Sequence, residues 1–217
     1  MIFQIPDILS VDELVQIQTA LAEADFIDGK LTAGWYAKQV KHNRQVKGKD
    51  AQDLRTLVKA ALLRHPLFQS AVRPKHIHSM LLSRYDPGME YGRHTDNALM
   101  GQYRSDVSFT VFLSDPATYE GGELVMEGAD DEQRYKYAAG SAIAYPSSTL
   151  HRVNPVISGV RLAAVGWVHS WVKEPAQREI LFDLDTVRRS LYAQTGKTDE
   201  FDLLCKSLAN LTRRWAE

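Results

Sequence analysis

Cysteine is nearly absent from this sequence of 217 residues, because Cys205 is its single cysteine. One thiol cannot form a disulfide within the chain, which favours a reducing, cytosolic setting over a secreted one. The chain also lacks an excess of either charge, since 26 Lys and Arg residues face 27 Asp and Glu residues and the net charge is -1. We therefore expect a cytoplasmic protein whose overall field attracts neither nucleic acid nor an anionic membrane.

Long apolar runs, internal repeats and low-complexity segments are missing as well. No stretch approaches the roughly 20 apolar residues that cross a bilayer, so we expect no membrane partner. The first residues lack a basic region followed by an apolar stretch, so we expect no secretory signal. The remaining composition, with 44% hydrophobic and 24% charged residues, is that of a globular protein. Its size predicts one domain with appendages, or two small domains.

The spacing of apolar residues divides the chain into three parts. Residues 1–76 predict a short strand followed by helices, the first of which begins with a capping box at Ser10 and Glu13. Residues 77–172 contain short segments rich in β-formers and separated by turn residues, which predicts an all-β sandwich or barrel. Residues 173–217 predict two amphipathic helices. We expect these helices to pack on the barrel, and the alternative is a subunit contact.

A basic and polar segment, WYAKQVKHNRQVKGKD at residues 35–50, lies among the predicted N-terminal elements. The simplest interpretation is a solvated loop or edge strand. The alternative is a flap over a binding site that recognises an anionic or aromatic substrate, with residues 38–49 facing that substrate.

Two histidines and one aspartate form the clearest chemical pattern. His94 and Asp96 are two residues apart, so in an extended strand their side chains point to the same side. His151 lies between two predicted strands, where it could complete a metal site from across the barrel. Two imidazoles and one carboxylate, with coordination positions left open, suit non-haem Fe(II), although the same ligands also bind Zn(II).

Arg161 favours iron over zinc. It begins a strand pattern in which Arg161, Ala163, Val165 and Trp167 alternate onto one face. If that face is inward, a guanidinium lies in a mostly apolar cavity, which is costly unless it is paired. A bound dicarboxylate supplies the partner, because guanidinium binds carboxylate through two parallel hydrogen bonds. A dioxygenase that uses 2-oxoglutarate needs such a group, and a zinc hydrolase does not.

Several runs, in this order, resemble the Fe(II)/2-oxoglutarate dioxygenases and, more narrowly, the bacterial PKHD-type hydroxylases: RYDPGMEYGRHTDN, SFTVFLSDP, GGELV, the stretch from Gly140 to His151, and RVNPVISGVRLAAVGWVHS. The resemblance is close over residues 77–172 and extends to KHNRQV and the C-terminal helices. It implies a mainly β fold with flanking helices, in which a double-stranded β-helix (jelly roll) carries N-terminal helices and a C-terminal helical extension. It also implies hydroxylation of a small-molecule or peptidyl substrate, with succinate and CO2 as co-products.

The resemblance gives roles to individual residues. It makes His94, Asp96 and His151 the ligands of Fe(II), and it makes Arg161 the residue that binds the distal carboxylate of 2-oxoglutarate. Tyr85 stands where related prolyl hydroxylases have a tyrosine near the co-substrate.

Phe112 departs from the pattern of the resemblance. Some related hydroxylases have a hydroxyl-bearing aromatic residue at this position, so more of the carboxylate binding would fall to the arginine and to Thr110. Tyr91, Asn97 and Trp167 are candidate substrate contacts, with ordinary structural roles as the alternative.

The resemblance further implies L-ascorbate as an additional cofactor and a link to iron uptake through a siderophore-like or peptide substrate. The C-terminal helices offer a surface for a homo-oligomer. Two other functions compete with catalysis by iron. One is a non-catalytic metal-binding jelly-roll module, such as a sensor, and the other is a zinc enzyme on the same fold.

Overall fold

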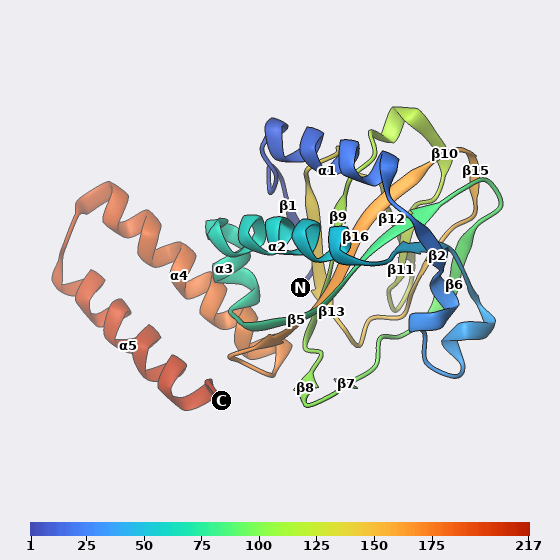
Figure 1. Ribbon diagram of the computed structural model, residues 1–217. Helices are drawn as coiled ribbons and strands as arrows, with labels where there is room; N and C mark the ends of the chain where they lie inside the picture. Colours follow the sequence, from blue (N-terminus) through green and yellow to red (C-terminus); the bar gives the residue numbers. More distant parts are fainter.

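The computed structural model describes residues 1–217, with all side chains except those of Lys49 and Asp50. Strands and helices alternate in its first half, strands fill the middle, and two helices end it (Figure 1). The helices are α1 (Val11–Glu23), α2 (Lys49–Arg64), α3 (Pro66–Val72), α4 (Pro175–Thr195) and α5 (Asp199–Trp215). Short 3-10 helices span Gly29–Thr32, Ala37–Gln39 and Pro116–Thr118.

Two antiparallel sheets form the centre of the molecule. The larger sheet contains β1 (Phe3–Ile5), β13 (Ala142–Pro146), β9 (Val107–Phe112), β16 (Arg161–Ser170), β5 (Pro74–Tyr85), β4 (Arg44–Val46) and β2 (Phe26–Asp28), in that spatial order. The smaller sheet contains β12 (Glu132–Tyr135), β11 (Leu124–Glu127), β14 (His151–Val153), β6 (Glu90–His94) and β3 (Lys41–His42). Two short pairs, β7 (Leu99–Met100) with β8 (Tyr103–Arg104) and β10 (Tyr119–Gly121) with β15 (Val156–Gly159), lie at the margins.

The two faces of the larger sheet bury different cores. One face packs against α1, α2 and α3, which lie together on one side of the sheet (Figure 1). Ile17 of α1, Leu62 of α2 and Phe68 of α3 belong to this core, together with Phe109 and Leu82 of the sheet. The opposite face looks toward the smaller sheet across a second core of Tyr85, Phe112, Leu124, Met126, Ile143, Tyr145, Val153 and Val156. The predicted mainly β fold with flanking helices is confirmed.

Local sequence explains the boundaries of the N-terminal helices. At the start of α1, the Ser10 hydroxyl accepts a hydrogen bond from the Glu13 amide, and the Glu13 carboxylate accepts one from the Ser10 amide. The predicted capping box is therefore present. Helix α2 ends at Arg64 because Pro66 disfavours helical backbone at His65, whose ψ is 120°.

The C-terminal helices differ from the prediction in part. Helix α4 buries Leu181 and contacts α3, as expected of a helix packed on the barrel. Helix α5 instead folds back along α4, away from the sheets (Figure 1), and none of its described residues is fully buried. The expectation that both helices pack on the barrel is thus wrong for α5. The 21 residues of α4 extend about 30 Å, so its far half reaches beyond the barrel and α5 covers it there.

No helix in the described part of the chain combines the length and the apolar character that crossing a membrane requires.

Candidate metal centre and active-site cavity

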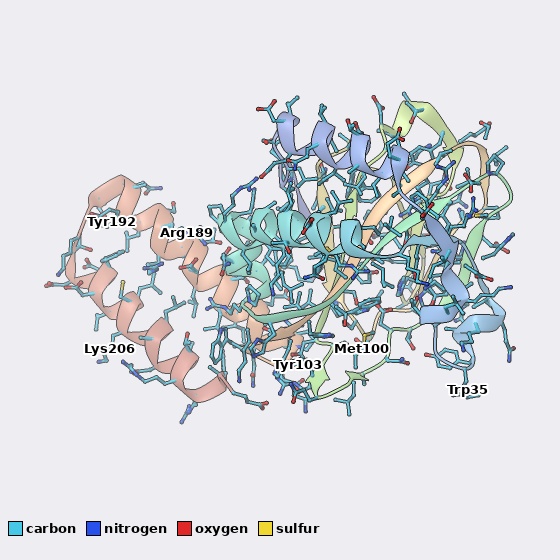
Figure 2. All side chains as sticks on the ribbon, viewed as in Figure 1. Trp35, Met100, Tyr103, Arg189, Tyr192 and Lys206 are labelled. Carbon is cyan, nitrogen blue, oxygen red and sulfur yellow. The ribbon has the colours of Figure 1, made fainter. Side chains whose placement is uncertain are left out.

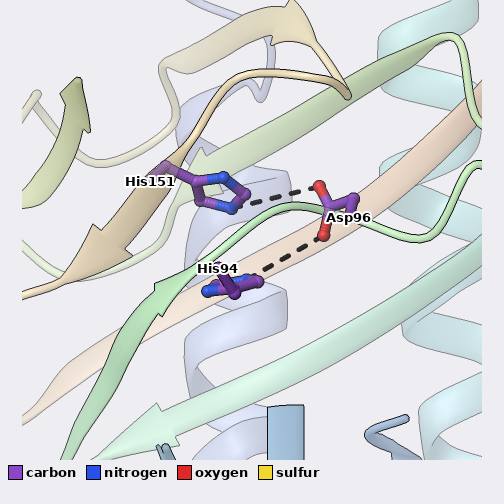
Figure 3. A group of neighbouring side chains, drawn as sticks. All are labelled: His94, Asp96 and His151. Atoms are coloured by element: carbon purple, nitrogen blue, oxygen red, sulfur yellow. Dashed lines mark ion pairs between the residues drawn. The ribbon is translucent and has the colours of Figure 1, made fainter. Parts of the chain in front are cut away.

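The three predicted metal ligands meet between the two sheets. His94 ends β6, Asp96 follows it by two residues, and His151 begins β14, which pairs with β6 so that His151 lies opposite His94. The Nε2 atom of His94 lies 4.0 Å from Oδ1 of Asp96, and that of His151 lies 3.9 Å from Oδ2 (Figure 3). One ligand atom from each residue lies within 4.8 Å of the others. This spacing lets one metal ion contact all three side chains.

Neighbouring groups hold these ligands in orientations that suit a metal. The Nδ1 atoms of His94 and His151 lie 2.7 and 2.9 Å from the carbonyl oxygen two residues earlier in the chain. Donation to those carbonyls puts the ring proton on Nδ1 and leaves the Nε2 lone pair free for a metal. The Ser108 hydroxyl donates to Oδ2 of Asp96 at 2.5 Å, which orients the carboxylate.

Burial prepares His94 electrostatically for a metal. Burial and the nearby His151 together lower the pKa of His94 to about 4. His94 is therefore neutral at pH 7, the state that binds metal. The Tyr91 ring stacks on the His94 ring with centroids 3.7 Å apart, and burial raises the pKa of Tyr91, so the phenol keeps its proton.

A cavity of about 370 Å³ connects the metal ligands to Arg161 on the larger sheet. The Arg161 side chain is among the most deeply buried in the protein, with the residue 1% exposed. None of its three guanidinium nitrogens forms a hydrogen bond of good geometry among the described residues, and no carboxylate pairs with it there, although the Tyr119 phenol lies nearby. Its Cζ lies 5.0 Å from the centre of the Tyr85 ring, and Thr110 also lines the cavity. The structure thus brings Arg161, Tyr85 and Thr110 to one wall.

Tyr145 is a residue of this wall that the sequence analysis missed. It lies on β13 beside β9, and it lines the cavity. Burial raises its pKa well above the ordinary value, so its hydroxyl stays protonated. Phe112 belongs to the core between the sheets. The cavity therefore has a phenol from β13, although position 112 carries none.

The three candidate substrate contacts, Tyr91, Asn97 and Trp167, all line the cavity. Tyr91 and Trp167 are half-buried, and Asn97 is exposed. The indole Nε1 of Trp167 is buried without a hydrogen-bond partner among the described residues. Their contact with a substrate stays a prediction.

The basic segment fits its simplest interpretation in part, because β3 is the edge strand of the smaller sheet. A solvated loop is the wrong description of its inward residues, since the cavity is lined by Lys41, Asn43 and Gln45, which are 4%, 3% and 3% exposed. Tyr36 also lines the cavity, and its hydroxyl donates to the carbonyl of Thr95 at 3.1 Å, which joins this segment to the loop between the metal ligands. The predicted range 38–49 includes Lys49, whose side chain lies outside the described residues.

Comparison with known proteins identifies the family of the chain that carries this site. Residues 80–169 match the 2OG-Fe(II) oxygenase superfamily, and residues 176–217 match the PKHD-type hydroxylase C-terminal domain. The chain is 62% identical to a PKHD-type hydroxylase of Picosynechococcus sp. and 61% identical to one of Acaryochloris marina, each over the full length of both chains. The chain belongs to the PKHD-type hydroxylases.

Solved structures confirm the jelly-roll fold of this PKHD-type hydroxylase. A 2OG-Fe(II) oxygenase family oxidoreductase from Burkholderia pseudomallei matches 76% of this chain and 82% of its own, with a TM-score of 0.56 and 17% identity. The collagen prolyl hydroxylase of Paramecium Bursaria Chlorella virus-1 matches 78% of this chain and 96% of its own, with a TM-score of 0.54 and 19% identity. At such identities the likeness concerns the fold.

The chemistry of the cavity fits the groups that this hydroxylase family implies. Two imidazole Nε2 atoms and a carboxylate suit Fe(II) with coordination positions left open. A buried guanidinium without a partner suits one carboxylate of 2-oxoglutarate. As a PKHD-type hydroxylase, the protein is an oxygenase of the Fe(II)- and 2-oxoglutarate-dependent class.

Proposed function

We propose that this protein hydroxylates a small-molecule or peptidyl substrate in the cavity between its sheets. Fe(II) is held by His94, Asp96 and His151, and 2-oxoglutarate is held through Arg161. One observation carries the proposal: the buried Arg161 guanidinium, with no partner in the described structure, opens into the cavity that holds the three metal-ligand atoms. An arginine so placed is unfavourable in the free protein and favourable once a carboxylate is bound.

Bound Fe(II) and 2-oxoglutarate supply the oxidising chemistry, in which O2 is consumed, succinate and CO2 are formed, and a hydroxyl group is placed on the substrate. The chain contributes position and environment. His94 and His151 offer Nε2 lone pairs fixed by their Nδ1 hydrogen bonds, and Asp96 offers a carboxylate oriented by Ser108. These contacts would fix the orientation of the three ligand side chains before any substrate enters.

The opposite wall binds and orients the co-substrate. Arg161 donates to its distal carboxylate through a planar fork, and the Tyr85 ring beneath the guanidinium restricts the rotation of that fork. Thr110 and the protonated Tyr145 offer hydroxyl groups at the same wall. A carboxylate bound at this wall would leave the rest of 2-oxoglutarate in the cavity that the metal ligands also line.

The segment around Tyr36 would limit the access of water to the cavity. Its hydroxyl is bonded to the Thr95 carbonyl, and Thr32, Gly34 and Ala37 line the cavity beside it. Exclusion of water strengthens the electrostatic contacts inside and limits side reactions of the oxidant.

Formation of succinate from 2-oxoglutarate tests this function. The assay uses protein with Fe(II), O2 and candidate small-molecule and peptide substrates, and L-ascorbate keeps the metal reduced. We expect succinate only when metal, co-substrate and O2 are all present, and we expect His151→Ala to abolish it. His76→Ala is the matched control, because His76 is an exposed histidine of β5 that does not line the cavity.

Other outcomes of the same assay point to the competing functions. Binding of 2-oxoglutarate without succinate formation under any substrate indicates a sensor. Activity that requires Zn(II) and ignores 2-oxoglutarate indicates a zinc enzyme. Either result contradicts the proposal.

We also propose that copies of this chain associate through the hairpin of α4 and α5. Its support is the exposure of large apolar side chains there, including Val187, Tyr192 and Leu203, with exposed fractions of 55%, 57% and 60%. Tyr192 lies at the outer end of this hairpin, far from the sheets (Figure 2). Sedimentation equilibrium should show an oligomer that Leu203→Glu dissociates, and a monomer at all concentrations would contradict the proposal.

A further inference from the structure

One wall of the cavity is made by a short segment that crosses between the two sheets. β3 joins the smaller sheet, where Lys41 pairs with Tyr91, and β4 joins the larger sheet, where Gln45 pairs with Ser83. Lys41, Asn43 and Gln45 alternate into the cavity, whereas His42 and Arg44 are exposed. Alternation is ordinary for extended backbone, but here the inward positions are polar.

A chain of hydrogen bonds fixes the orientation of this wall. Lys41 Nζ donates to Thr32 Oγ1 at 3.1 Å, and Thr32 Oγ1 lies 2.7 Å from Gln45 Oε1, to which it donates. The Gln45 oxygen is thereby satisfied, and its Nε2 group is left as a buried donor without a partner among the described residues. The side-chain amide of Asn43 is also buried and forms no hydrogen bond of good geometry among the described residues, and the Tyr85 phenol lies beside it. Buried polar groups of this kind are unfavourable unless something binds them.

Lys41 adds a buried positive charge to this wall. No carboxylate among the described side chains forms a salt bridge with it. Its Nζ lies 5.1 Å from the centre of the Tyr91 ring, whose face provides partial compensation. Because Tyr91 stacks on the ligand His94, the ammonium lies close to the metal centre. It is therefore a cation within the reaction cavity that the proposed function does not use.

Charge balance indicates what this cation binds. In the loaded site, the Asp96 carboxylate and the dianion 2-oxoglutarate together balance Fe(II) and Arg161. Lys41 is left without a counter-ion at a buried position, where an unpaired charge is costly. Its position on the smaller sheet also separates it from Arg161, which lies on the larger sheet with Tyr85.

We propose that Lys41, Gln45 and Asn43 form the substrate subsite, and that the substrate presents a carboxylate to Lys41 and Gln45. This inference rests on the proposed function, because it assumes that 2-oxoglutarate occupies the Arg161 wall. Two N–H groups of Lys41 and the Nε2 group of Gln45 are the donors for the carboxylate. The amide of Asn43 is the partner for an adjacent polar group of the substrate. Specificity for an acidic substrate thus resides in the basic segment between the sheets.

Binding of matched probes tests the subsite without turnover. The protein is loaded with Zn(II) in place of Fe(II) and with 2-oxoglutarate, and ligand-observed NMR compares N-acetylleucine with N-acetylleucinamide, and N-acetylphenylalanine with its amide. We expect each carboxylate to bind about tenfold tighter than its amide, the effect of charge-assisted hydrogen bonds. Lys41→Met should remove this preference. Lys47→Met, an exposed lysine of the same segment that does not line the cavity, should keep it.

A second measurement separates a functional lysine from a structural one. In the protein loaded with Zn(II) and 2-oxoglutarate, the Asp96 charge is balanced by the metal, so removing the cation in Lys41→Met should raise the melting temperature, whereas loss of a structural contact would lower it. The affinity of Lys41→Met for 2-oxoglutarate should equal that of the unaltered protein.

Three results would overturn the subsite: no carboxylate preference in the unaltered protein, a preference that survives Lys41→Met, or weaker 2-oxoglutarate binding in Lys41→Met. The last result would place Lys41 at the co-substrate and leave the proposed function intact. Failure of the proposed function is seen separately, as absence of an Fe(II)–2-oxoglutarate complex in the unaltered protein.

Discussion

Among single residues, Arg161 connects the energetics of the fold most directly with its chemistry. Burying a guanidinium without hydrogen-bond partners is unfavourable, because the group loses its hydration and gains nothing in return. The residue is nevertheless packed against the Tyr85 ring inside the cavity. A bound carboxylate would supply the hydrogen-bond partners and the opposite charge that the guanidinium lacks.

Replacement of Arg161 by Met should weaken 2-oxoglutarate binding far more than Fe(II) binding. We expect a loss of at least about a hundredfold, because the fork forms two charge-assisted hydrogen bonds of about 1.5 to 3 kcal/mol each. Arg161→Lys should recover part of the loss, since it keeps the charge but not the fork. Anaerobic calorimetric titration of each ligand measures both affinities. Unchanged affinity for 2-oxoglutarate in Arg161→Met would show that another residue binds the carboxylate.

The sequence pointed to the residues whose spacing reflects local geometry. His94 and Asp96 share a strand direction, and Arg161 begins an alternating run, so their proximity could be predicted in part from each strand alone. Tyr145 was missed, and Lys41 was covered only by the alternative that residues 38–49 face the substrate, because the inward direction of both side chains depends on pairing with distant strands. The alternation of polar residues at Lys41, Asn43 and Gln45 was the available signal. It was misleading, because polar residues in alternation ordinarily face solvent.

Among the structural elements, the turn before β11 is tied to the site through Gly122. This residue has a φ of 66°, and a Cβ atom built on it would lie 3.0 Å from Cδ of Arg161 and 3.0 Å from Cγ2 of Val156. The Gly-Gly pair of the sequence therefore does more than make a turn, because it leaves room for the arginine.

The variant Gly122→Ala should lower stability and also weaken 2-oxoglutarate binding several-fold, because the new methyl group displaces Arg161. Gly101→Ala is the matched control. Its φ of 62° gives a similar backbone strain, but no described atom lies within 4 Å of the added Cβ. The melting temperature should fall in both variants. The dissociation constant of 2-oxoglutarate should rise only in Gly122→Ala. Equal dissociation constants in both variants would show that Gly122 does not influence the binding of 2-oxoglutarate.

The junction of α1 and α2 gives the fold a dependence on acid. Hydrogen bonding to Arg64 lowers the pKa of Glu13 from 4.5 to about 2. A carboxylate whose pKa is lowered by folding stabilises the protein above its unfolded pKa, and this stabilisation is lost as the pH falls through the folded value. Between pH 4.5 and about 2, the melting temperature of Glu13→Gln should therefore vary less steeply than that of the unaltered protein. Parallel curves would show that the pair contributes nothing.

For the whole molecule, the order of element types was predictable and the pairing of strands was not. The β-rich middle and the flanking helices follow from the periods of apolar residues. Strand partners depend on contacts between distant parts of the chain, such as the pairing of Phe3 with Ala144. The position of α5 was mispredicted for a related reason, since an amphipathic pattern gives the buried face but not the surface that covers it.

The two-sheet arrangement places the metal ligands and the arginine on opposite walls. The smaller sheet supplies His94 and His151, and the larger sheet supplies Arg161, so the cavity is completed only when both sheets assemble. A ligand that bridges the walls should consequently stabilise the fold as a whole.

Visible absorption of the protein with Fe(II) and 2-oxoglutarate, recorded without oxygen, tests the central claim most directly. A 2-oxo acid chelated to Fe(II) gives a charge-transfer band. We predict that the band appears and saturates at equal amounts of iron and protein, that it is lost in His151→Ala, and that it requires more 2-oxoglutarate in Arg161→Met. A folded, unaltered protein that shows no band at saturating Fe(II) and 2-oxoglutarate would contradict the account.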